Sequence, residues 1–110
     1  MATVTINDTY AEVLSALGDL QEAIDTALQR YTIEQIGTKI AELQRRDAHY
    51  QQKYGMDYHT FSERIAEDES FVNQIEASVS KTWEFDLSDW EFCHKGIEDW
   101  IRKLQAILLT

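Results

Sequence analysis

Residues 83–108 read WEFDLSDWEFCHKGIEDWIRKLQAIL. Large side chains recur along this stretch at alternating intervals of four and three residues, the heptad pattern of a helix that packs one stripe against another helix. The stripe predicts a helical seam at Trp83, Leu87, Trp90, His94, Ile97, Ile101, Leu104 and Leu108. Because the pattern persists over more than three heptads, we expect a mainly α-helical protein in which this helix forms one arm of a hairpin.

The rest of the chain has few residues that end a helix, since its 110 residues include no proline and only four glycines. Gly18 followed by Asp19 predicts the end of one helix and the cap of the next. We therefore expect a first helix from about Thr9 to Leu17, with Asp8 or Thr9 as its N-cap.

A second helix is expected to begin near Asp19 and to end at Gly55, where the chain folds back as an antiparallel hairpin. Asp57 is placed to cap the helix that follows. The glycine and the β-branched residues within Thr32–Gly37 leave open whether residues 19–54 form one helix or two.

Beyond the turn, the acidic run Glu67–Glu69 interrupts the apolar pattern and predicts a break. The spacing after it allows one helix from about Ser70 to Leu108 with a single stutter. We expect residues 1–31 to form a strand-helix-helix dimerisation segment and residues 32–110 to form the helical hairpin, within one continuous domain. Whether the helices swap between chains stays open.

A short β-strand is expected at the N-terminus, where Thr3, Val4, Thr5 and Ile6 alternate with period two and are β-branched. A strand this short is not stable alone. Because no second strand-like run follows, its partner is expected to be a second copy of the chain or another protein. The fold is therefore expected to be completed by dimerisation.

Charge and composition exclude several classes of protein. The net charge is −10 and the pI is near 4.6, which argues against binding nucleic acid by charge. No uncharged run is long enough to span a membrane, and the first residues do not read as a secretory signal. A single cysteine, Cys93, forms no intramolecular disulfide, so we expect a cytoplasmic protein.

The charge is unevenly distributed along the chain. Residues 1–30 carry five acidic side chains and one basic, residues 31–54 carry three acidic and four basic, and residues 55–110 carry twelve acidic and five basic. This asymmetry favours antiparallel pairing of the middle helix with the last one, and it leaves surplus acid for a basic protein partner.

Two stretches resemble a known class of protein. Residues 3–6 with residues 10–31, YAEVLSALGDLQEAIDTALQRY, resemble the ribbon-helix-helix unit of bacterial antitoxins. Residues 54–61, YGMDYHTF, together with the heptads that begin at Trp83, are similar to the downstream half of small prokaryotic antitoxin-like proteins. The resemblance implies a homodimer paired through Thr3–Ile6 and a toxin as partner.

The resemblance also implies DNA contacts from the outward strand residues Thr3, Thr5 and Asn7. Here the sequence departs from the pattern, because Arg30 is the only basic residue among the first 30. Without cations, counterion release cannot supply affinity for DNA. We therefore expect the dimerisation role to be kept and DNA binding to be weak or absent.

Catalysis and cofactor binding have little support. Cys93 and His94 are adjacent, so they point about 100° apart on a helix and do not form a nucleophile–base pair. Glu91-x-x-His94 has the spacing of di-iron helices, but neither His49 nor His59 repeats it. We expect no enzyme activity, no cofactor and no metal site, with His94 serving as a polar seam residue that fixes register.

Candidate partner-binding residues lie away from the seam, at Phe85, Phe92, Trp100, Asp86 and Asp89. A helix that buries one stripe and carries aromatics elsewhere either offers a second surface to a partner or has a wide face inside a bundle. Two functions follow as hypotheses. One is an antitoxin-like subunit that neutralises a basic toxin by occlusion, and the other is a self-assembling coiled-coil structural or adaptor protein.

Overall fold

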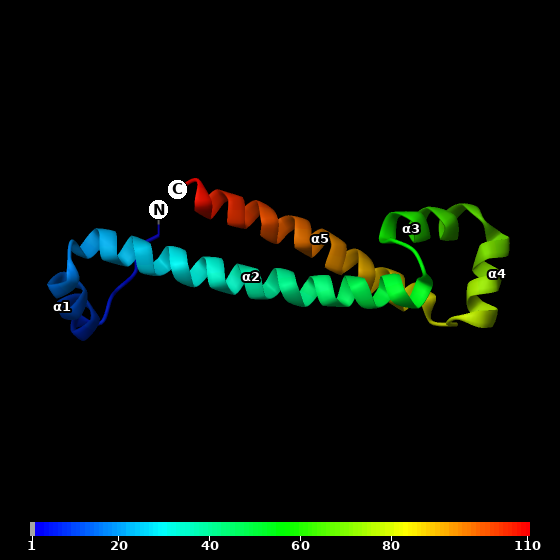
Figure 1. The fold of residues 1–110 in the computed structure, drawn as a ribbon, viewed down its shortest axis with the longest axis horizontal. Coiled ribbons are helices and arrows are strands. Elements are labelled where there is room, and N and C mark those ends of the chain that lie inside the picture. The colour runs from blue at the N-terminus through cyan, green and yellow to red at the C-terminus, as the bar shows by residue number, and fades with distance from the viewer. Residues whose placement is uncertain (1) are drawn as a thin grey trace. The chain divides into compact units, whose positions relative to one another are not determined.

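The computed structural model describes residues 2–110, and those residues form five α-helices and no strand (Figure 1). The helices are α1 (Asp8–Leu17), α2 (Leu20–Tyr54), α3 (Tyr58–Glu67), α4 (Glu69–Ser78) and α5 (Trp83–Leu108). The mainly α-helical class is therefore confirmed. The chain divides into two compact units, Met1–Gln35 and Ile36–Thr110, and α2 contributes its first part to one and its remainder to the other. Within the described chain, no helix is both long and apolar enough to cross a membrane.

The N-terminal unit follows its local sequence signals with two differences. Residues 2–7 form no strand, and residues 2–110 contain no partner strand for Thr3–Ile6. The cap of α1 is Asn7, whose side chain accepts a hydrogen bond from the Thr9 amide at 2.9 Å, rather than Asp8 or Thr9. Gly18 ends α1 as expected, and the Asp19 carboxylate caps α2 by accepting from the Glu22 amide at 2.9 Å.

Helix α2 continues without interruption through the segment where one helix or two remained open. The Thr32 hydroxyl donates to the Leu28 carbonyl at 2.8 Å, so this β-branched residue satisfies its polar group within the helix. Gly37 adopts no left-handed conformation, and nothing lies within 4 Å of a Cβ placed there.

The turn after α2 is built as the sequence predicts. Gly55 has a φ of 74°, the left-handed conformation that favours glycine at the end of a helix. Asp57 caps α3 by accepting from the Thr60 amide at 2.8 Å. Asp68 lies between α3 and α4, and its carboxylate caps α4 by accepting from the Phe71 amide. The predicted break at Glu67–Glu69 is therefore confirmed.

A single helix from Ser70 to Leu108, which the spacing allowed, is wrong. Helix α4 ends at Ser78 and α5 begins at Trp83. The Ser80 hydroxyl accepts from the Thr82 amide at 3.1 Å, a local bond that competes with helix continuation. The Trp83 indole N–H then donates to Glu76 of α4 at 3.0 Å across the break.

The core of the second unit is aromatic and lies where α2, α3, α4 and α5 meet. Its buried members are Tyr54, Phe61, Phe71, Ile75 and Trp90. Phe61 is at the centre, with ring centroids 4.4 Å from Tyr54 and 5.5 Å from Trp90. Four helices thus converge on a few large rings, which bury much apolar area for so short a chain.

Candidate interaction surface

One side of α5 is joined to α2 by charged and phenolic groups. Asp89 accepts from Arg46 in an ion pair and from the Tyr50 hydroxyl at 2.6 Å. One turn earlier, Asp86 accepts from Lys53 at 2.6 Å and from the Tyr54 hydroxyl. The later residues of α2 pair with the earlier residue of α5, so the two helices run antiparallel along this stretch, with basic side chains of α2 facing acidic side chains of α5.

These bonds shift the ionisation of the groups that make them. Partial burial acts to raise the pKa of Asp86, but hydrogen bonds from Lys53 and Tyr54 outweigh it and hold that pKa below its ordinary value. Burial, followed by the bond to Asp86, raises the pKa of Tyr54 well above its ordinary value. Asp86 and Asp89, expected among the partner-binding candidates, are thus engaged within the chain.

The predicted seam is buried to different degrees along its length. Trp90 is fully buried, whereas Trp83, Leu87, His94, Ile97 and Leu104 are half-buried and Ile101 is 39% exposed. Cys93, the neighbour of His94 in the sequence, is fully buried, whereas His94 is half-buried. Its burial raises the pKa of the Cys93 thiol, as expected for an unreactive buried cysteine.

His94 faces α3. Its ring stacks on Tyr58 with centroids 4.9 Å apart and meets His59 edge-on, also at 4.9 Å. Glu98, one turn along α5, lies 3.6 Å from its Nε2 atom. Among residues 2–110, no three His, Cys, Asp or Glu side chains gather closely enough to hold a metal ion.

Phe85 and Phe92 lie on the outer face of α5. They are seven residues apart, so they share a face, and they are 79% and 63% exposed. The Arg46 guanidinium carbon lies 5.8 Å from the Phe92 ring centroid, which connects this face to the charged contact with α2. Trp100 is half-buried, with the Lys103 ammonium 4.5 Å from its ring centroid. The sequence left two interpretations of these aromatics, a surface for a partner or a wide apolar face inside a bundle. In the single chain, Phe85 and Phe92 are not inside a bundle.

The sequence alone did not reveal one further polar contact. The Trp90 indole donates to the Asp47 carboxylate at 2.6 Å. Asp47 lies in the basic middle segment and stands out in no motif. The only sequence signal for a contact between this part of α2 and α5 was the basic charge of residues 31–54, which favours pairing with an acidic helix.

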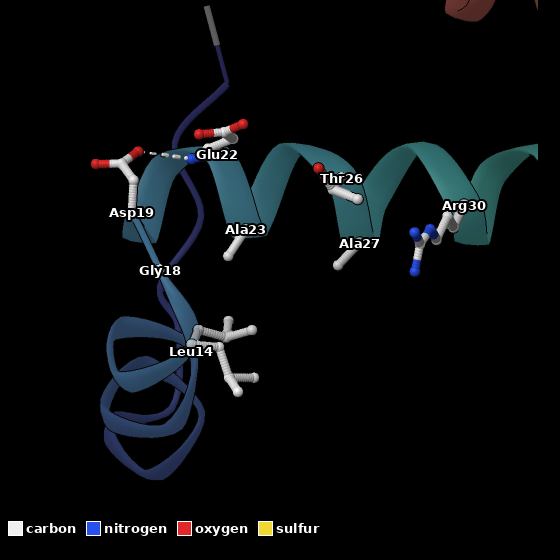
Figure 2. Close-up of a pocket in the computed structure, with 9 residues that line it drawn as sticks. Leu14, Gly18, Asp19, Glu22, Ala23, Thr26, Ala27 and Arg30 are labelled. Atoms are coloured by element: carbon white, nitrogen blue, oxygen red, sulfur yellow. Dashed lines mark hydrogen bonds between the residues drawn. The ribbon is translucent and has the colours of Figure 1, made fainter.

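The N-terminal unit presents a second surface, in the corner between α1 and α2 (Figure 2). Leu14 of α1 and Ala23, Ala27 and Arg30 of α2 project into the angle between the two helices. Leu17, Gly18, Asp19, Glu22 and Thr26 complete the lining.

Comparison with known proteins returns no relative: no protein-family model matches the chain, and no curated protein or solved structure matches it.

Proposed function

We propose that this protein is a non-enzymatic interaction subunit, similar in role to an antitoxin, that binds a basic protein in the cytoplasm and neutralises it by occlusion. The observation that carries the proposal is the exposure of Phe85 and Phe92 on one face of an acidic helix that buries Trp90 and Cys93 elsewhere. Large exposed aromatics on one face are typical anchors of protein interfaces.

The charge around these rings favours a basic partner. Helix α5 carries six acidic and three basic side chains, and Glu84 and Glu91 lie next to Phe85 and Phe92 in the sequence. Complementary charge speeds association and selects partners, while aromatic side chains that become buried in the interface supply most of the affinity. In this proposal Phe85, Phe92 and Trp100 contact the partner, and Asp86 and Asp89 hold α5 in position against α2.

A self-assembling structural or adaptor protein is the second candidate. It is favoured by the N-terminal unit, in which no described residue is buried and Val4 is 80% exposed. In both candidates we propose a homodimer. Pairing of Thr3–Ile6 between two copies is one way to form it, because a strand absent from the single chain can form between chains. DNA binding is not part of either proposal.

A pull-down with mass spectrometry tests the proposal. The tagged wild-type chain, expressed in its native cells, is expected to recover a basic protein, and the Phe85→Ala/Phe92→Ala variant is expected to lose it. Tyr10→Ala is the matched control, because it removes an aromatic side chain that is 68% exposed on α1 and should retain the partner. Circular dichroism should show equal helicity for all three.

Two results would contradict the proposal. One is a basic partner that the double variant binds as well as the wild type does. The other is a wild-type chain that recovers no protein and forms a stable oligomer by light scattering, which would establish the self-assembling alternative.

A further inference from the structure

A hollow runs along the exposed side of α5, beside the Phe92 ring. Its lining residues are Ser88, Glu91, Phe92, Lys95, Gly96 and Asp99. All six belong to one helix, so the hollow is a feature of the surface of α5 itself. Phe92 is 63% exposed and the side chains of Lys95 and Asp99 are 69% and 53% exposed, so this side of α5 is open to solvent.

The spacing of the lining residues defines the shape of the hollow. In a coiled coil, each side chain that projects from one helix enters a hole formed by four residues of the facing helix, at positions i, i+3, i+4 and i+7. One such hole is formed by Ser88, Glu91, Phe92 and Lys95. The next hole along α5 is formed by Phe92, Lys95, Gly96 and Asp99. Two successive holes on one side of a helix fit two projecting side chains of a single facing helix.

The neighbouring helices of the chain contact other sides of α5. Helix α2 lies along one edge of the hollow, where Arg46 approaches the Phe92 ring and a Cβ at Gly96 would lie 2.9 Å from Leu43. Helix α3 packs on His94, which does not line the hollow. A further helix can therefore approach α5 at the hollow without displacing α2 or α3.

The first hole has aromatic side chains at both ends. Phe85 lies three residues before Ser88 and Phe92 lies four residues after it, so the three share one side of the helix. The small Ser88 side chain between two exposed rings leaves room for a large apolar side chain. Burying that side chain against both rings would remove apolar surface from water on both molecules.

The charges along the hollow favour a basic helix. Glu84 and Glu91 are seven residues apart, so both lie on the same flank, where a facing helix would place its own charged residues. Lys95 is the basic residue in the lining, and its ammonium is already bound by the Glu91 carboxylate at 2.7 Å. Asp99 supplies a second acid to the lining. Lysine or arginine beside these carboxylates would complement them.

We propose that this hollow binds an amphipathic basic α-helix of the partner protein, which inserts large apolar side chains into the two holes and places lysine or arginine beside Glu84 and Glu91. The inference rests on the proposed function and deepens it, because it names the element of the partner that Phe85 and Phe92 contact. At a rise of about 1.5 Å per residue, the hollow is about three helical turns long, so a short helix is enough to fill it.

Two synthetic peptides test the class of partner, with binding measured by fluorescence anisotropy. Each has about three heptads with leucine at positions a and d; one carries lysine at e and g, and the other carries glutamate there. The lysine peptide is expected to bind the wild-type chain at least roughly tenfold more tightly than the glutamate peptide. Equal binding of both peptides, or binding of neither, would overturn the inference.

Substitutions that preserve net charge locate the binding site, because general attraction of a cationic peptide to an acidic protein does not change with them. Phe92→Ala should weaken the lysine peptide roughly tenfold by removing one wall of both holes. Ser88→Leu should weaken it comparably by filling the first hole, although it adds apolar surface. Ser78→Leu is the matched control, since it makes the same exchange at an exposed position of α4 and should leave binding unchanged.

The direction of the Ser88→Leu effect is decisive. An apolar surface without shape would bind the peptide as well or better after this substitution, and that result would show that the hollow receives no side chain. Circular dichroism should show equal helicity for the wild type and all three variants, so a loss of binding reports the surface and not the fold.

The inference and the proposed function can fail separately. If a basic protein is recovered from cells through Phe85 and Phe92 but neither peptide binds, the inference is wrong and the function stands. If the lysine peptide and the variants behave as described but no basic protein is recovered, the proposed function fails and the helix-binding surface stands.

Discussion

The indole N–H of Trp90 on α5 donates a hydrogen bond of 2.6 Å to the Asp47 carboxylate on α2. Trp90 is fully buried, so this bond satisfies its only polar group away from water. The second carboxylate oxygen of Asp47 accepts from Gln51 at 2.8 Å, which holds the acceptor in place. The Asp47 carboxylate therefore helps to set the register between α2 and α5 at this point.

Replacing Asp47 by alanine should destabilise the protein by about 1–3 kcal/mol, because a buried indole donor loses its acceptor. Urea unfolding followed by tryptophan fluorescence measures the change. Asp47→Asn is the control, since its amide oxygen still accepts from the indole, and it should cost less than Asp47→Ala. Equal losses in the two variants would show that the hydrogen bond is not what stabilises this contact.

Stability should depend on pH through Asp86. Its pKa is lowered in the folded chain, so its contribution is complete above the pKa of the unfolded chain, about 3.9, and is lost as the pH falls through the folded value. At neutral pH Asp86→Asn should be less stable than the wild type by about 1 kcal/mol, because it removes the charge that pairs with Lys53. That difference should be constant above about pH 5 and should vanish in strong acid. Urea unfolding at a series of pH values measures it, and a difference that grows on acidification would contradict the assignment.

The two glycines Gly37 and Gly55 should respond oppositely to alanine. Gly55 has a φ of 74°, where a Cβ is strained, so Gly55→Ala should lose about 1 kcal/mol. Gly37 lies inside α2 with nothing within 4 Å of an added Cβ, so Gly37→Ala should gain up to about 1 kcal/mol from helix propensity. Thermal unfolding by circular dichroism reports both, and a gain at Gly55 would mean that the turn does not need a left-handed residue.

The two phenylalanine environments should separate stability from binding. Phe61 is fully buried among aromatic rings, so Phe61→Ala should cost about 3–5 kcal/mol. Phe85 is 79% exposed, so Phe85→Ala should change the free energy of unfolding by less than about 0.5 kcal/mol. Chemical denaturation of both variants tests this, and a large loss at Phe85 would place that ring in a packed interface of the purified protein.

Cys93 should report unfolding directly. Its side chain is fully buried and burial raises the pKa of its thiol, so both access and thiolate formation are suppressed in the folded chain. A thiol reagent should label the native protein slowly and the urea-unfolded protein rapidly. Phe61→Ala should accelerate native labelling, whereas Phe85→Ala should not; fast labelling of the wild type would contradict the burial of Cys93.

The local signals of the sequence predicted most of the helix boundaries. Gly18 with Asp19 and Gly55 with Asp57 are short-range stop and cap pairs, and their physics is complete within a few residues. The acidic run around Asp68 gave the break between α3 and α4 for the same reason. Asn7, the cap of α1, stands beside Asp8 and Thr9, which are capping residues of the same quality, so residue type alone does not distinguish the three.

The features that sequence reasoning did not predict depend on contacts between distant residues. The heptad spacing identified α5 and placed His94 in its seam, whereas the structure buries the neighbouring Cys93 more deeply than His94, because α3 packs on one side of α5 and α2 on another. The bond from Trp90 to Asp47 joins residues 43 positions apart, and no local pattern encodes it. The exposure of Phe85 likewise depends on which sides of α5 the other helices cover.

The uninterrupted course of α2 has a consequence for how the N-terminal unit stays ordered. The backbone hydrogen bonds of α2 are continuous from its C-terminal part, where Ile36, Leu43 and Tyr54 are buried, to residues 20–35, where no residue is buried. Local opening of such a helix costs less with distance from its packed part, so amide hydrogen exchange should quicken from Tyr54 toward Leu20. Binding of another chain to the exposed part of α2 would slow that exchange. The exchange rates along this one helix would therefore report whether a partner is bound.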